Sequence, residues 1–241
     1  MKRPLFVLLL SSAVVLSSCE TLNQTAQVLS QSLGNPTSAE IASGLKEALQ
    51  LGTSASAERL NTQNGFLGNA AVKLLFPPEA QKVEKALRSL GLNQLCDNVI
   101  TSLNRAAEDA VIEAKPIFIS AIKQMTISDA SSILLGNQSD AATQYFQRVT
   151  NDQLSAKFQP IIQSSLAKVG ATRNWTEVVS RYNQIPLVTD INPDLTSYVT
   201  QKAIDGLFME IAKEELKIRQ NVSSRNSILL QKVFGYADRQ K

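Results

Sequence analysis

Apolar residues recur at three- and four-residue spacing along most of this sequence, and that periodicity restricts its fold more than any other feature. The clearest run contains Leu92, Leu95, Cys96, Val99, Ile100, Leu103 and Ala107. Such spacing gathers apolar side chains on one side of an α-helix. We find no neighbouring pair of segments with the alternating pattern of a β-hairpin, and no repeat of solenoid length. The sequence therefore predicts an all-α fold with about eight to ten helices in one domain.

Capping residues, glycines and prolines divide this domain into predicted helices. Thr37 and Glu40 form a capping box at its start, and Pro116 predicts a kink or a break near its middle. The predicted helices cover approximately residues 37–60, 78–90, 92–107, 117–125, 126–135, 139–149, 151–169, 174–182, 194–220 and 228–234. Residues 61–68 and 185–193 are predicted loops. The apolar run Val72–Phe76 fits either an extended segment or a single helical turn, and the sequence leaves both open.

The first residues have the composition of a bacterial signal peptide. Lys2 and Arg3 form a basic start, and the apolar run of residues 4–16 is too short to cross a hydrocarbon core of about 30 Å. The motif Leu16-Ser17-Ser18-Cys19 resembles a lipobox, which implies cleavage after Ser18 and acylation of Cys19. A plain signal peptide with a chance cysteine is the alternative. We therefore expect residues 1–18 to be removed and the mature chain to be held on a membrane through lipid on Cys19.

The sequence between the lipid and the domain predicts a tether. Residues 19–36 are rich in glutamine, serine, threonine and asparagine, although Leu22, Ala26, Leu29 and Leu33 also fit one face of a short amphipathic helix. Residues 37–241 then form the predicted helical domain. Glu20, in place of an aspartate, favours the outer membrane by analogy with enterobacterial sorting. We expect the domain to face the periplasm.

Composition excludes several classes of function. The formal charge of +3 falls close to neutral when Lys2 and Arg3 are removed, so phosphate contacts to nucleic acid are not expected. The chain contains no histidine, which excludes Ser-His-Asp and Cys-His catalysis and histidine-containing zinc sites. Lipid on Cys19 leaves Cys96 alone on an apolar helix face, where a buried, unreactive thiol is expected. Phosphate-binding, dinucleotide-binding and EF-hand motifs are also absent from the sequence. We predict no metal, no cofactor and no enzymatic activity.

Two groups of residues are candidate sites. Asn104, Arg105 and Glu108 fall within one helical turn, close in sequence to Lys115, and form either an anion-binding site or a hydrogen-bond network between helices. We favour the network. The second group is aromatic and consists of Tyr145, Phe146, Phe158, Trp175 and Tyr182. These rings could line a pocket for an apolar, lipid-like ligand, but core packing explains them without a ligand, and we favour packing.

Several segments resemble one family of bacterial envelope proteins, catalogued only as domain of unknown function 4197. The matching segments are Gly65-Phe66-Leu67, Val72-Lys73, residues 103–108, residues 114–118, residues 141–146, residues 198–200 and residues 205–208. The resemblance spans approximately residues 37–235. It implies an all-helical domain of secreted or lipid-anchored proteins. It carries no known activity, ligand or catalytic residue.

Three functions from different classes remain for such a chain. The first is an envelope lipoprotein that acts through contacts with other envelope proteins, and this is our leading hypothesis. The second is a carrier or sensor for a small apolar ligand held between helices. The third is an enzyme that uses carboxylates, lysine or arginine alone. The sequence does not identify the partner, the ligand or the oligomeric state.

Overall fold

The structure, a computed structural model, describes residues 34–168 and 194–240, together with residues 170, 172, 175, 176, 179 and 180. Within these residues the chain is all-helical and contains no strand, which confirms the predicted fold class. The helices are α2 (Ser38–Asn61), α3 (Gln81–Ser89), α4 (Asn93–Val111), α5 (Ala114–Gln124), α6 (Ile127–Leu135), α7 (Ala141–Lys168), α9 (Leu195–Gln220) and α10 (Ile228–Arg239). Two 3₁₀ turns, η1 (Pro78–Ala80) and η2 (Val222–Ser224), precede α3 and α10.

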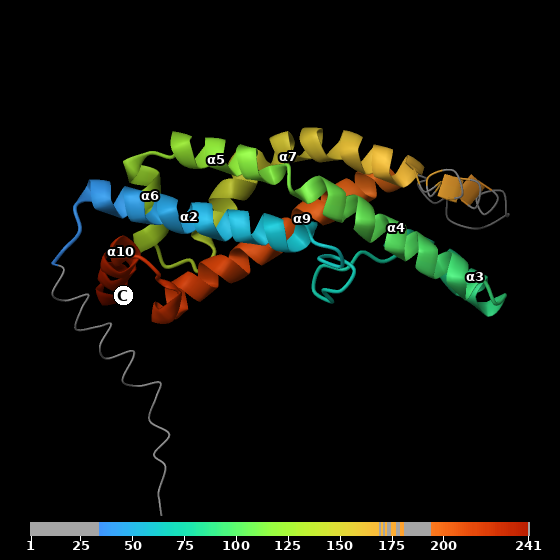
Figure 1. Ribbon diagram of the computed structural model, residues 1–241, viewed down its shortest axis with the longest axis horizontal. Coiled ribbons are helices and arrows are strands. Elements are labelled where there is room, and N and C mark those ends of the chain that lie inside the picture. Colours follow the sequence, from blue (N-terminus) through green and yellow to red (C-terminus); the bar gives the residue numbers. More distant parts are fainter. Residues whose placement is uncertain are drawn as a thin grey trace, which may run out of the picture.

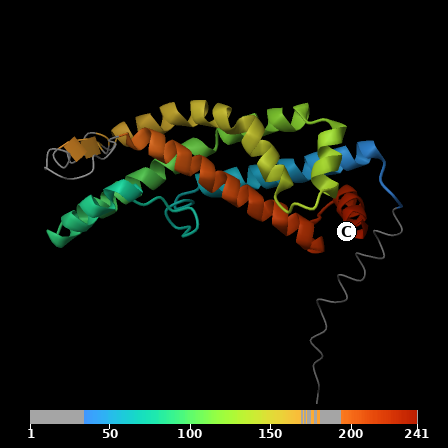
Figure 2. The same cartoon turned by 180° about the vertical axis from the view of Figure 1, so that it is seen from behind.

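The helices form an elongated bundle around two long antiparallel helices (Figure 1). α9 lies along α7 and also packs against α2 and α4. At one end, α5, α6 and α10 pack against α2. At the other end, α3 and the first turns of α4 project as a helical hairpin, as both views show (Figures 1 and 2). The loop between α2 and η1 lies beside α9 and α4.

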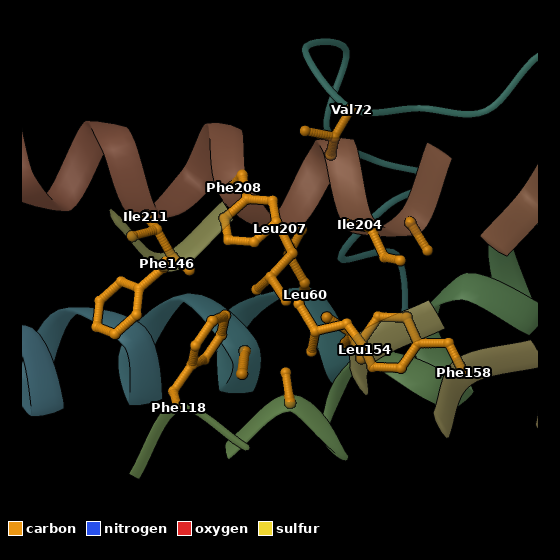
Figure 3. Packing of buried hydrophobic residues seen from close by; sticks show 14 of the residues in the cluster. Leu60, Val72, Phe118, Phe146, Leu154, Phe158, Ile204, Leu207, Phe208 and Ile211 are labelled. Carbon is orange, nitrogen blue, oxygen red and sulfur yellow. The ribbon is translucent and has the colours of Figure 1, made fainter. Parts of the chain in front are cut away.

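One continuous apolar core holds the bundle together. Figure 3 shows Leu60 of α2, Phe118 of α5, Phe146 of α7 and Phe208 of α9 converging between the helices. The ring centroid of Phe118 lies 5.1 Å from that of Phe146 and 6.1 Å from that of Phe208, in tilted and edge-on arrangements. Full burial of each such side chain contributes about 1.5–3 kcal/mol, so packing supplies the main stabilisation.

The predicted capping signals are confirmed where they can be seen. The Thr37 hydroxyl accepts a hydrogen bond from the Glu40 amide at 3.2 Å, and the Glu40 carboxylate accepts one from the Thr37 amide at 2.8 Å. Thr126 and Asp129 make the same reciprocal pair at the start of α6. These bonds satisfy amides that the first turn of a helix cannot pair internally, so both helices begin where the sequence predicts.

The prediction of separate helices over residues 139–149 and 151–169 is wrong, because α7 is continuous from Ala141 to Lys168. The Thr150 hydroxyl donates to the Phe146 carbonyl at 2.7 Å, within the helix. The buried face also continues without interruption through Leu154 and Phe158. Tertiary packing along this face outweighs the local turn preference of the two polar residues that follow Thr150.

Pro116 marks a break between helices, as predicted. α4 ends at Val111 and α5 begins at Ala114, which places Pro116 in the first turn of α5. A proline is tolerated there because the amide it lacks would have no partner within the helix. α10 covers the helix predicted over residues 228–234 and packs back onto α2.

Several predictions concern residues outside the described part of the chain. These are the signal peptide, Cys19, most of the tether, Tyr182 and the loop at 185–193. Among the helices that are described, none combines the length and the hydropathy that crossing a bilayer requires.

Candidate functional site

After the turn in which the Val72 and Lys73 amides bond the Asn69 carbonyl, the segment Val72–Phe76 is extended, which favours one of the two structures that the sequence left open. Val72, Leu74 and Phe76 are buried, whereas Lys73 and Leu75 are exposed. Burial therefore alternates with the two-residue period of a β-strand. The segment lies between α4 and α9 without a neighbouring strand.

The side chain of Asn104 on α4 makes the hydrogen bonds that a neighbouring strand would make. Its side-chain Oδ1 accepts the Leu74 N–H at 2.9 Å, and its Nδ2 donates to the Leu74 C=O at 2.8 Å and to the Ile100 C=O at 2.7 Å. One carboxamide can bond both the N–H and the C=O of another residue only where these two backbone groups point the same way. They do so in extended backbone. Asn104 is fully buried and every hydrogen-bonding atom of its side chain is used, which makes it a structural residue.

Glu108 and Arg105 attach the preceding loop to α4. Glu108 is 3 % exposed, and its Oε1 accepts the amides of Phe66 and Leu67 at 3.1 and 3.2 Å. The Arg105 guanidinium bonds the other oxygen of Glu108 and donates to Asn64 Oδ1 at 2.9 Å. The three residues Asn104, Arg105 and Glu108 thus form the hydrogen-bond network that we favoured.

Lys115 lies outside this network. Its Nζ donates to Glu58 Oε1 at 2.6 Å, which links α5 to α2. Both side chains are partly exposed, so this pair contributes little stability. The sequence placed Lys115 near the cluster because the chain distance is short, but the break before α5 directs it to a different neighbour.

Charged pairs on a helix are usually solvated, but one such pair on α9 is not. Glu215 and Arg219 are buried and their side chains are joined at 2.8 Å. Glu215 accepts the amides of Ala142 and Thr143 at 3.0 and 2.9 Å. Its carboxylate therefore caps the first turn of α7, where a negative charge is favourable.

Arg219 completes the junction at the other side of Glu215. Its guanidinium donates to the carbonyls of Ile133 and Leu134 at 2.9 and 3.3 Å. These carbonyls belong to the last turn of α6, which favours a positive charge. A buried ion pair thus joins the ends of α6 and α7 to α9.

A second buried acid on α9, Glu210, holds the loop that follows α2. It accepts hydrogen bonds from Arg59 at 2.9 Å, from Asn69 at 3.1 Å and from Lys213 at 2.5 Å. Burial acts to raise the pKa of Glu210, but these donors together lower it below its usual value. The acid is therefore held ionised by its structural partners and is a poor proton donor.

The described surface contains an open groove between the extended segment and α9. Its volume is about 320 Å³, and Lys73, Leu75, Tyr198, Lys202 and Met209 are among the residues that line it. Leu75 is 51 % exposed and Met209 is 44 % exposed, although both are apolar. Exposed apolar residues at a concave surface are typical of a binding site.

Tyr198 fixes one wall of this groove. Its hydroxyl donates to the Leu75 carbonyl at 3.0 Å, which ties the first turn of α9 to the extended segment. Burial, with a smaller contribution from Glu79, raises the pKa of Tyr198, so the hydroxyl stays a hydrogen-bond donor at neutral pH. With Asn104 on its other side, the segment is held from both directions.

The aromatic residues predicted as a possible pocket are not gathered around one space. Phe146 packs against Tyr145, with ring centroids 5.8 Å apart, and belongs to the central core. Trp175 packs against Phe76 instead, with ring centroids 5.7 Å apart. Phe158 is fully buried further along α7, and Tyr182 lies outside the described residues. None of the four rings that the structure describes lines the groove between the extended segment and α9.

The one cysteine of the described part of the chain is buried, as predicted. Cys96 has no exposed surface, and burial raises the pKa of its thiol. A raised pKa lowers the thiolate fraction and makes the residue a poor nucleophile. No group of three acidic or cysteine residues within the described ranges is placed to hold a metal ion.

The groove was not predicted from the sequence, since its apolar rim comes from residues far apart in the chain. Leu75 belongs to the apolar run at 72–76 that the sequence shows, but Met209 lies on α9, more than a hundred residues later. The apolar run of residues 72–76, in which only Lys73 is polar, was the one available signal. It could have indicated an extended segment, although not its partner.

Comparison with known proteins identifies the family of this chain. Residues 35–235 match the family described as protein of unknown function (DUF4197). The chain belongs to this family. The resemblance proposed from the sequence is therefore confirmed, and the DUF4197 match covers almost all of the helices described above. No curated protein and no solved structure matches the chain.

Proposed function

We propose that this DUF4197 protein is a lipid-anchored protein of the bacterial envelope that acts through contacts with another protein. The observation that carries the proposal is the groove between the extended segment and α9, where Leu75 and Met209 remain exposed. Both residues belong to well-packed elements, so their exposure is a feature of the folded domain.

The residue types that could perform chemistry have structural uses in this domain. Asn104 supports the extended segment, Glu108 holds a loop, Glu215 caps α7 and Arg219 caps α6. Groups with all their hydrogen bonds satisfied inside the protein have none left to bind or activate a substrate. This favours an interaction protein over an enzyme.

The lipobox and the polar tether support the location. Lipid on Cys19 would hold the domain at a membrane, and a near-neutral chain gives no separate electrostatic attraction to it. The carrier hypothesis has less support, because Phe146 and Phe158 are fully buried among other core side chains.

Two measurements test this proposal. In the native bacterium, an alkyne-labelled fatty acid is expected to label the wild-type protein and to be lost in Cys19→Ser, which should also leave the membrane fraction. A photo-crosslinking amino acid at Met209 is expected to yield a protein adduct in intact cells, whereas the same group at the exposed Gln124 of α5 should not. Equal adducts at both positions, or labelling that survives Cys19→Ser, would contradict the proposal.

A further inference from the structure

The backbone of the extended segment has unpaired groups on the edge that faces α9. On the α4 side, both groups of Leu74 are bonded to Asn104. In an extended chain the N–H and C=O groups of residues 73 and 75 point to the opposite edge. The Tyr198 hydroxyl reaches the Leu75 carbonyl there, which shows that this edge faces the groove.

Two of the four groups on this edge have no partner among the described residues. The Lys73 N–H is bonded to the Asn69 carbonyl at 2.9 Å, and the Leu75 C=O is bonded to Tyr198. Within the described part of the chain, no group bonds the Lys73 C=O or the Leu75 N–H. The free acceptor and the free donor therefore flank Leu74, two residues apart.

This arrangement is one side of a β-bridge. In a parallel pair, a single residue of the second strand donates its N–H to one residue and accepts from the residue two positions later. In an antiparallel pair, the same C=O and N–H are bonded by two residues of the second strand, which lie on either side of the residue opposite Leu74. The Lys73 C=O and the Leu75 N–H are therefore complementary to an added strand.

From this geometry we propose that the groove binds an extended peptide segment of a partner protein, which adds as a strand beside Lys73–Leu75. A peptide amide would donate to the Lys73 C=O, and a peptide carbonyl would accept the Leu75 N–H. Unpaired strand edges are sites where other chains add by main-chain hydrogen bonds, and side-chain contacts then give selectivity.

The exposed side chains indicate the peptide that would fit. Lys73 pairs with no acid in the described ranges, so an acidic residue beside it is favourable. Leu75 and Met209 offer an apolar contact at the other end of the groove. Because side chains on one face of a strand recur every second residue, the peptide should carry an acidic and an apolar residue two positions apart.

The inference rests on the proposed function for the existence of a protein partner, and its test is independent of lipid and location. Full-length protein purified from the bacterium in detergent is panned against a phage-displayed library of random linear peptides. The peptides that bind should share the acidic and apolar pair at this spacing. Affinities of fluorescently labelled synthetic copies are then measured by polarisation.

Leu75→Pro gives the decisive variant, because it removes the unpaired N–H, leaves the C=O that Tyr198 bonds, and favours extended backbone at Leu74. We expect binding to weaken about tenfold or more, since the peptide carbonyl loses its donor. Leu75→Ala keeps the N–H and should weaken binding by less, through lost apolar contact alone. Thermal unfolding of both variants checks that the domain remains folded.

A second measurement does not alter the protein. Methylating peptide amides one at a time should weaken binding about tenfold at the residue that pairs with Lys73, and much less at its two neighbours. The inference is overturned if no peptide is selected, if the selected peptides bind Leu75→Pro as tightly as wild type, or if methylation at every position has the same effect. None of these outcomes bears on the lipid anchor, which fatty-acid labelling tests separately.

Discussion

The Asn104 carboxamide bonds both backbone groups of Leu74, at 2.9 Å through Oδ1 and at 2.8 Å through Nδ2. A single side chain on α4 thus provides the hydrogen bonds that a neighbouring strand would provide. Both residues are buried, so water cannot replace these bonds. The wall of the groove that carries Leu75 depends on this contact.

Replacing Asn104 should therefore destabilise the domain. Asn104→Ala leaves the N–H and the C=O of Leu74 buried without partners, and we expect the free energy of unfolding to fall by about 2–4 kcal/mol. Urea denaturation followed by circular dichroism measures the loss. Asn98→Ala on the exposed side of the same helix, where the side chain bonds only Gln94, should change it by less than about 0.5 kcal/mol. Equal effects of the two substitutions would show that the Leu74 contact is unimportant.

Breaking the buried pair of Glu215 and Arg219 should lower the free energy of unfolding by more than the loss of Asn104. Glu215→Ala leaves the Arg219 guanidinium buried without its carboxylate and removes the acceptor for two amides of α7. Such a change typically costs about 3–5 kcal/mol. Lys217→Ala serves as the control, because its side chain is 57 % exposed and its ammonium lies 3.5 Å from Glu214. A loss below about 1 kcal/mol in Glu215→Ala would contradict the capping role.

Local signals in the sequence were enough to predict the helices with clear ends. The capping boxes at Thr37 and Thr126 and the break before Pro116 involve residues within one or two turns of each other. The continuity of α7 was missed because the turn preference after Thr150 is local, whereas the packing that overrides it comes from other helices.

The candidate site was predicted only in part, because some of its contacts are local in the sequence and others are not. Asn104, Arg105 and Glu108 share a helical turn, so their proximity followed from the sequence, and the network that joins them to the loop was the favoured interpretation. Their partners lie about thirty to forty residues earlier, at a distance that no periodicity specifies. Burial of Glu215 depends in the same way on amides about seventy residues away. A charged residue cannot be assumed to be exposed, because its side chain can cap a helix that is distant in the sequence.

Gly206 of α9 makes room for the loop that carries the extended segment. A β-carbon at this position would lie 2.8 Å from Phe66 Cε1 and 3.2 Å from Val72 Cβ, closer than packed atoms allow. Gly206→Ala should displace the loop and lower the free energy of unfolding by about 1–3 kcal/mol. Gly52→Ala on α2 has only a 3.4 Å contact with Glu214 Cβ, and should raise stability by up to about 1 kcal/mol because alanine favours the helix. Thermal unfolding compares the two variants, and shifts of the same sign would contradict the packing argument.

The contact between Glu40 and Lys232 predicts how stability responds to acid. Lys232 Nζ donates to Glu40 Oε1 at 2.6 Å, which joins the first turn of α2 to α10. This bond, together with the Thr37 amide, lowers the pKa of Glu40 from 4.5 to about 2. Folding therefore favours the ionised carboxylate, so the contribution of Glu40 is complete above pH 4.5 and is lost as the pH falls towards 2.

A carbon-13 NMR titration of the glutamate carboxyl groups measures this pKa directly. In Lys232→Met, where the first cause of the shift is removed, the pKa of Glu40 should rise towards 4.5, and the loss of stability in acid should begin at a higher pH. Lys46→Met on α2 provides the control, since Lys46 pairs with no acid in the described part of the chain and its loss should leave the Glu40 titration unchanged. A Glu40 titration near 4.5 in the wild-type protein would show that α10 is not held to α2 by this contact.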